Sequence, residues 1–228
     1  MAVYSYVTGF PLLLLVIALS AFIALGYSRG RKNNNKIYIS AFQDLAEIFK
    51  PDDQTFTNIG GFVGHHANFR FEEKDVVSEI DATITLLPRH APLYMPISRL
   101  LMGNDRLFIS LYMRCSPPGE GHLIEKEYAG FRGPKITNAP RLYREEVRWG
   151  QYEYYLYYEQ MNMYRRLMEF IGTTPDPGNI RHVAILPDQR KGFIFMIPQE
   201  GEVARHLKPV YELIVNIFGS LYNKKGKE

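Results

Sequence analysis

The first 28 residues contain no charged side chain, and from Val7 to Tyr27 nearly every position is apolar. A run of this length, at about 1.5 Å per helical residue, matches a bilayer hydrocarbon core of roughly 30 Å. Two alternatives are a buried core helix and a cleaved signal peptide. The run has no polar face for the first and no positive charge before it for the second. The pattern therefore favours a retained transmembrane helix over residues 7–28.

Four basic residues follow the apolar run within eight positions, and none precedes it. Because positive charge is retained on the cytoplasmic side, we expect residues 1–6 outside the cell or in a lumen, and the rest in the cytoplasm. Residues 29–36 are predicted to be a basic juxtamembrane linker. These four side chains could contact anionic lipid head groups or ribosomal RNA. They are Arg29, Arg31, Lys32 and Lys36.

Residues 37–222 show the periodicities of a folded domain. Ile80–Leu86 and Leu107–Met113 alternate between apolar and polar positions, which is typical of half-buried strands. Apolar residues at helical spacing predict helices at Ile37–Phe49, Ala91–Met102 and Glu202–Tyr222. The other predicted elements are a loop at Thr55–Gly64, strands at His122–Ala129 and Leu142–Trp149, a long helix at Gln151–Ile171, and a hairpin of Val183–Leu186 with Phe193–Ile197.

One boundary has two interpretations. The tyrosine-rich residues 152–158 could begin the long helix, whose predicted stripe includes Tyr157, Met161 and Tyr164, or they could extend a strand. Strands and helices do not alternate strictly along the chain. We therefore expect an α+β domain with a mainly antiparallel sheet and packed helices.

Charge and cysteine content exclude several classes of protein. The domain carries 20 of the 27 basic residues against 23 of the 24 acidic ones, so a basic nucleic-acid-binding body and a DNA partner are not expected. A disulfide framework and a cysteine-based zinc site are excluded within one chain by a single cysteine, Cys115. Three further basic residues, with the same two candidate contacts as residues 29–36, lie in a predicted tail at 223–228: Lys224, Lys225 and Lys227.

The sequence carries no recognisable grouping of catalytic residues. His65 and His66 follow a glycine-rich stretch, but adjacent residues on a strand point to opposite faces and cannot easily share one metal ion. The other histidines form no HExxH pair, and no G-x-S-x-G is present. Cys115 is more typical of a small buried side chain than of a nucleophile. We therefore expect no catalytic residues, no cofactor and no metal.

The order of elements resembles the calumin family, also called coiled-coil domain-containing protein forty-seven. The likeness lies in three stretches: FIALGYSRGRKNNNK (22–36), ITLLPRHAPLYMPISRLLMGNDRLFISLYMR (84–114) and ILPDQRKGFIFMIPQEGE (185–202). Members of that family also have a long acidic luminal segment and a basic coiled-coil tail. The resemblance is thus to a reduced form, with an archaeal source as one expectation.

The resemblance implies a non-enzymatic role. The family contributes a subunit of the PAT complex, which assists insertion and folding of multi-span membrane proteins at the ribosome-bound translocon. The implied partners are the lipid bilayer, translocon or insertase subunits, nascent membrane proteins and the ribosome with its RNA. The alternative hypothesis is a membrane-anchored domain that binds a ligand or acts as an enzyme on an unknown substrate.

Overall fold

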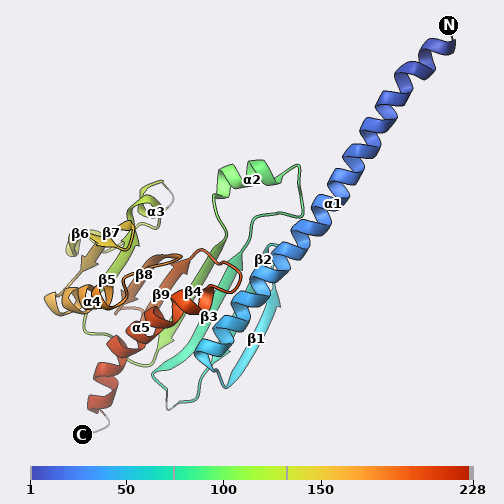
Figure 1. The fold of residues 1–228 in the computed structure, drawn as a ribbon. Coiled ribbons are helices and arrows are strands. Elements are labelled where there is room, and N and C mark those ends of the chain that lie inside the picture. The colour runs from blue at the N-terminus through green and yellow to red at the C-terminus, as the bar shows by residue number, and fades with distance from the viewer. Residues whose placement is uncertain (1, 74, 132, 226–228) are drawn as a thin grey trace.

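A computed structural model describes residues 2–73, 75–131 and 133–225, and it confirms the α+β prediction. A long N-terminal helix leads into a domain built on one nine-stranded antiparallel sheet, with shorter helices around it (Figure 1). The strand order is β1-β2-β3-β4-β9-β8-β5-β7-β6. The strands are β1 (Asp53–Asn58), β2 (Gly64–Arg70), β3 (Val77–Thr85), β4 (Arg106–Met113), β5 (Gly121–Glu125), β6 (Tyr143–Trp149), β7 (Tyr152–Tyr158), β8 (Ile180–Leu186) and β9 (Lys191–Met196).

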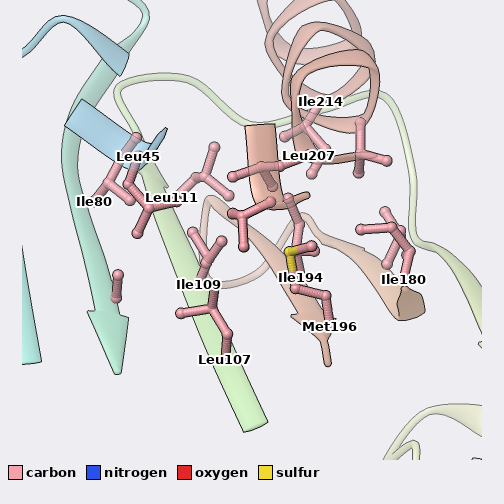
Figure 2. Close-up of a cluster of buried hydrophobic side chains, with 14 of the residues drawn as sticks. Leu45, Ile80, Leu107, Ile109, Leu111, Ile180, Ile194, Met196, Leu207 and Ile214 are labelled. Atoms are coloured by element: carbon pink, nitrogen blue, oxygen red, sulfur yellow. The ribbon is translucent and has the colours of Figure 1, made fainter. Parts of the chain in front are cut away.

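Helices cover one face of this sheet. The second half of α1 (Ala2–Phe49) lies beside α5 (Val203–Lys225) on that face, and α4 (Met161–Thr173) covers β5 and β7 (Figure 1). The alternating apolar side chains of β3, β4, β8 and β9 point toward α5, and Figure 2 shows Leu207 and Ile214 of α5 above Leu111 and Ile194. Burial of these aliphatic side chains is the main source of the domain's stability.

Helix α1 corrects the prediction of a linker at residues 29–36. These residues are helical, and one uninterrupted helix joins the apolar run to the predicted helix at Ile37–Phe49. Its buried positions after Tyr27 recur at helical spacing, so the charged side chains of residues 29–36 face solvent while small and apolar residues, together with Asn34, face the domain. The buried positions are Gly30, Asn34, Ile37, Ala41, Phe42, Leu45 and Phe49.

The prediction of one helix over Gln151–Ile171 is wrong. Tyr152–Tyr158 forms strand β7, which is the second interpretation of the tyrosine-rich stretch, and only Met161–Thr173 is helical. The buried face of α4 consists of Met163, Leu167 and Phe170, whereas Met161 is exposed. The predicted stripe was therefore placed on the wrong face of the helix, because it was aligned on Tyr157, which belongs to strand β7.

Three smaller boundaries also differ. The predicted loop at Thr55–Gly64 contains most of β1, whose residues are all exposed and, apart from Phe56, polar, so there is no alternation to detect. The predicted strand at His122–Ala129 ends at Glu125, where α3 (Lys126–Phe131) begins. Residues 91–94 form turns before α2 (Met95–Met102). The predicted strands over residues 80–86, 107–113 and 142–149, the hairpin and the last helix are confirmed, with ends shifted by a few residues.

Candidate functional site

One described helix is long and apolar enough to cross a membrane, and it is the part of α1 that begins at Phe10. None of its apolar window is buried against the domain. The four predicted contact residues Arg29, Arg31, Lys32 and Lys36 follow this window, and all four are exposed on the continuing helix. The structure thus brings them together as a basic band around α1, beside the domain and next to the apolar run.

Asn34 lies within this band but faces inward, and it is fully buried. Its side-chain nitrogen donates hydrogen bonds of 2.9 Å to the carbonyl oxygens of Phe62 and of Leu87. Its side-chain oxygen accepts a bond of 3.1 Å from Arg89. A single amide thus fastens the helix to the loop before β2 and to the chain after β3.

Arg89 carries the network further. Its guanidinium binds the carboxylate of Asp105 through two bonds of 2.9 Å and 2.7 Å. The same carboxylate accepts a 2.7 Å bond from the backbone N–H of Leu87. Two-pronged arginine–carboxylate pairs of this kind fix geometry as well as energy. We call Asn34, Arg89 and Asp105 the junction network.

Two glycines of α1 allow the chain to approach the helix closely. A β-carbon at Gly30 would lie 1.9 Å from the carbonyl oxygen of Arg89, and one at Gly26 would lie 2.8 Å from the ring of Pro92. Real β-carbons do not come so close, so both positions need glycine if this packing is to exist. The chain after β3 is therefore packed directly against α1 at the end of the apolar run.

Aromatic rings cluster at the same level. Tyr27 meets the edges of Phe62 and His90 at centroid distances of 6.2 Å and 6.1 Å. The guanidinium of Arg31 lies 4.7 Å from the centre of the Phe62 ring. Tyrosine and arginine at the end of an apolar helix are typical of a membrane–water boundary.

An open groove runs along the basic band. Its volume is ≈ 630 Å³, and Arg31, Lys32 and Lys36 contribute all the positive charge of its lining. Glu200 also lines the groove and forms an exposed ion pair of 3.3 Å with Lys36. Such a groove can attract phosphate groups, since lysine and arginine are the usual donors to them. Lipid head groups and RNA both carry phosphates of this kind.

The second basic group lies elsewhere. Lys224 and Lys225 are the last two residues of α5, and Lys227 lies outside the described residues. The end of α5 is at the opposite end of the molecule from the apolar part of α1 (Figure 1). The structure therefore does not combine the two predicted basic groups into one site.

A buried polar cluster occupies the other face of the sheet, near β5 and β8. His122 donates a 2.9 Å hydrogen bond from Nε2 to Glu120, and Asn138 donates a 2.8 Å bond to the same carboxylate. The Nδ1 atom of His122 lies 3.3 Å from Nε2 of His182. The two imidazoles share one hydrogen bond, in which one ring nitrogen donates and the other accepts. From the sequence these histidines appeared unrelated, because only the pairing of β5 with β8 brings them together.

Burial, with a smaller contribution from the neighbouring His122, lowers the pKa of His182 to about 3. Its imidazole is therefore neutral at cellular pH. The hydrogen bond from His122 is the largest cause of a lowered pKa at Glu120, which keeps this carboxylate ionised. A charged carboxylate held by two donors stabilises the fold around it. Tyr128 of α3 packs near His182 at a centroid distance of 6.5 Å.

The prediction that His65 and His66 point to opposite faces of a strand is confirmed. His65 stacks on Tyr38 of α1 at 3.8 Å, whereas His66 is on the opposite face and contacts Thr83 at 3.0 Å. Within residues 2–73, 75–131 and 133–225, no group of three or more His, Cys, Asp or Glu side chains is placed to hold a metal ion. Cys115 is half-buried and its thiol points to the carbonyl of Phe218 at 3.3 Å.

The junction network is the part of the site that sequence reasoning missed. The run of three asparagines looked like a polar linker, yet Gly30, Asn34 and Ile37 are spaced by four and three residues, as on one face of a helix. That spacing was the available signal. Comparison with protein-family models and with curated protein sequences finds no match for this chain.

Proposed function

We propose that this protein is a membrane-anchored, non-enzymatic scaffold that assists the insertion and folding of multi-span membrane proteins at the ribosome-bound translocon. The observation that carries the proposal is the continuity of α1. The same helix supplies the apolar run, the basic band and part of the domain core. A domain built in this way is held rigidly on its anchor, so its height and orientation follow those of the helix.

Further contacts support a rigid connection between anchor and domain. Asp44 of α1 accepts a 3.0 Å hydrogen bond from the backbone of Ala204, and Ser40 accepts one of 2.9 Å from Gly201. These bonds satisfy backbone donors at the start of α5, where a negative charge is also favourable. Both helices on the sheet are thus tied to one another and to the apolar run.

The biogenesis role itself comes from the resemblance to the calumin family in residues 22–36, 84–114 and 185–202. The first two stretches contain the basic band, Arg89 and Asp105, so the resemblance covers the junction network. The partners proposed on this basis are translocon or insertase subunits, nascent membrane proteins and the ribosome. The basic band would face the ribosome or the lipid head groups from the membrane surface.

Affinity purification of the full chain from native membranes in mild detergent, followed by mass spectrometry, tests this proposal. Recovery of translocon subunits, insertase subunits or ribosomes above an untagged control is expected. Purification of the anchored protein without any of them would refute the biogenesis role.

A matched pair of variants separates the basic band from net charge. Arg29→Gln with Lys32→Gln removes two exposed charges of the band, and we expect it to reduce co-purified partners severalfold. Arg165→Gln with Lys208→Gln removes two exposed charges from α4 and α5 and should leave recovery unchanged. Equal loss in both variants would show that the band has no special part in binding.

A further inference from the structure

Helix α2 has an inverted distribution of polar and apolar side chains. Leu93, Ile97, Leu100 and Leu101 are 60%, 55%, 78% and 60% exposed. Within the helix, Ile97, Leu100 and Leu101 are spaced by three and one residues and so lie on one face, and Leu93 lies in the turn just before the helix. Ser98 is buried instead, with its hydroxyl pointing at the sulfur of Met102 at 3.3 Å. A helix of a soluble domain normally turns such an apolar stripe toward the core.

The helix belongs to an excursion that the sheet does not require. β3 and β4 are antiparallel neighbours, and such strands can be joined by two to five residues. Here residues 86–105 intervene, and α2 stands clear of the sheet on the side of the apolar half of α1 (Figure 1). The excursion therefore places α2 beside the candidate span.

The contacts at its base hold the excursion in place. Arg89 and Asp105 pair across its two ends at 2.7 Å, and Asn34 joins them to α1. Pro92 packs against Gly26, within the last turn of the apolar run. The α2 segment thus starts from the level at which α1 changes from apolar to basic.

We infer that α2 is an interfacial helix whose apolar stripe enters the cytoplasmic leaflet of the membrane that α1 crosses. The inference rests on the membrane anchoring in the proposed function. Its stripe and the apolar run of α1 are both exposed, and Arg99, the only charged residue of α2, suits anionic head groups. A lipid bilayer accommodates both the apolar stripe and the single positive charge of α2.

Depth-dependent quenching in lipid nanodiscs tests this inference on the full chain. Single cysteines at Ile97, Leu19 and Gln189 are each labelled with an environment-sensitive fluorophore. The background is Cys115→Ser, which keeps a hydroxyl near the Phe218 carbonyl. Leu19 lies in the apolar run, whereas Gln189 is exposed in the β8–β9 turn, at the end of these strands away from α2.

We expect spin-labelled phospholipids to quench the Leu19 and Ile97 probes at least about twofold more than the Gln189 probe. Quenching of Leu19 without Ile97 would overturn the interfacial helix and leave the anchor standing. A Leu19 probe that is quenched no more than the Gln189 probe would overturn the anchor and the inference together. Circular dichroism and the melting temperature of each labelled protein show that the fold is retained.

Lipid composition distinguishes insertion of the stripe from surface attraction. In nanodiscs of neutral phosphatidylcholine, insertion predicts that Ile97 remains quenched, since apolar burial does not need anionic lipid. Quenching that occurs only with anionic lipid and disappears at high salt would contradict insertion of the stripe. Leu101→Cys, on the same face, should behave as Ile97→Cys does.

Discussion

The backbone of Gly30 in α1 lies against the carbonyl group of Arg89, so closely that a β-carbon at position 30 would be 1.9 Å from the oxygen. This contact joins the membrane-proximal helix to the chain after β3 without any intervening side chain. Adding even one carbon atom at position 30 would therefore disturb the junction between the apolar run and the domain.

Replacing Gly30 with alanine should therefore destabilise the junction, although alanine favours helices. The added methyl group forces α1 and residue 89 apart, at a cost of about 1–3 kcal/mol. Hydrogen exchange should accelerate in residues 86–90 and in the middle of α1. Gly172→Ala in α4, where a β-carbon meets nothing within 4 Å, is the control and should leave both unchanged. An unaltered exchange pattern in Gly30→Ala would contradict the close contact.

Asn34→Ala should weaken the same junction by a different mechanism. It removes a buried donor from the Phe62 carbonyl and the acceptor for Arg89, at a cost of about 1–3 kcal/mol in unfolding free energy. Asn33→Ala changes the neighbouring exposed asparagine and is expected to cost less than about 0.5 kcal/mol. Thermal or chemical unfolding of the two variants in the same nanodiscs gives the comparison. Equal losses would show that Asn34 has no special structural part.

The pH dependence of stability should reveal His182. Its pKa is lowered from 6.5 to about 3 in the fold, so only the unfolded chain takes up the proton between these values. Stability is then fully present above pH 6.5 and is lost as the pH falls, by up to about 1.4 kcal/mol per pH unit. Glu120, whose pKa is also lowered, adds to the loss only near and below its ordinary value of 4.5.

Unfolding measurements between pH 7.5 and 4.5 check this expectation, since Glu120 contributes little there. His182→Gln should flatten the slope, and His66→Gln, on a half-exposed histidine, is the matched control. A slope that does not change in His182→Gln would mean that this imidazole takes up no proton on unfolding.

The orientation of the chain can be tested with protease. If the basic band is retained in the cytoplasm, protease added to sealed, right-side-out cells should leave the domain intact. Neutralising Arg29, Arg31, Lys32 and Lys36 with glutamine should produce a mixed orientation and partial digestion. Neutralising Arg165 and Lys208, more than 100 residues from the span, should have no such effect. Complete digestion of the unaltered domain in unbroken cells would reverse the proposed topology.

The elements best predicted from sequence were those whose side chains have one clear buried face. The alternation of Leu107, Ile109 and Leu111 revealed β4, because every second residue is in the core. β1 was missed because both faces of its chain are exposed. In α2 the helix was predicted, but sequence periodicity cannot say whether an apolar stripe faces a core or a bilayer.

Long-range polar contacts were beyond the reach of sequence reasoning. Asn34 and Leu87 are 53 residues apart, and His122 and His182 are 60 apart. Local spacing predicts which face of a helix is buried, but it does not predict which carbonyl an amide meets there. The basic band was predicted residue by residue, while the network that holds it in place depends on the fold.

The continuity of α1 has a mechanical consequence. After Tyr27 the helix continues to Phe49, about 33 Å at 1.5 Å per residue, with no joint at the expected membrane surface. A span accommodates a thinner bilayer by tilting, and tilts of about 20° are ordinary. Over this lever arm such a tilt displaces Phe49 sideways by roughly 11 Å and rotates the whole sheet with it. Bilayer thickness would thus set the angle at which the domain faces its partners.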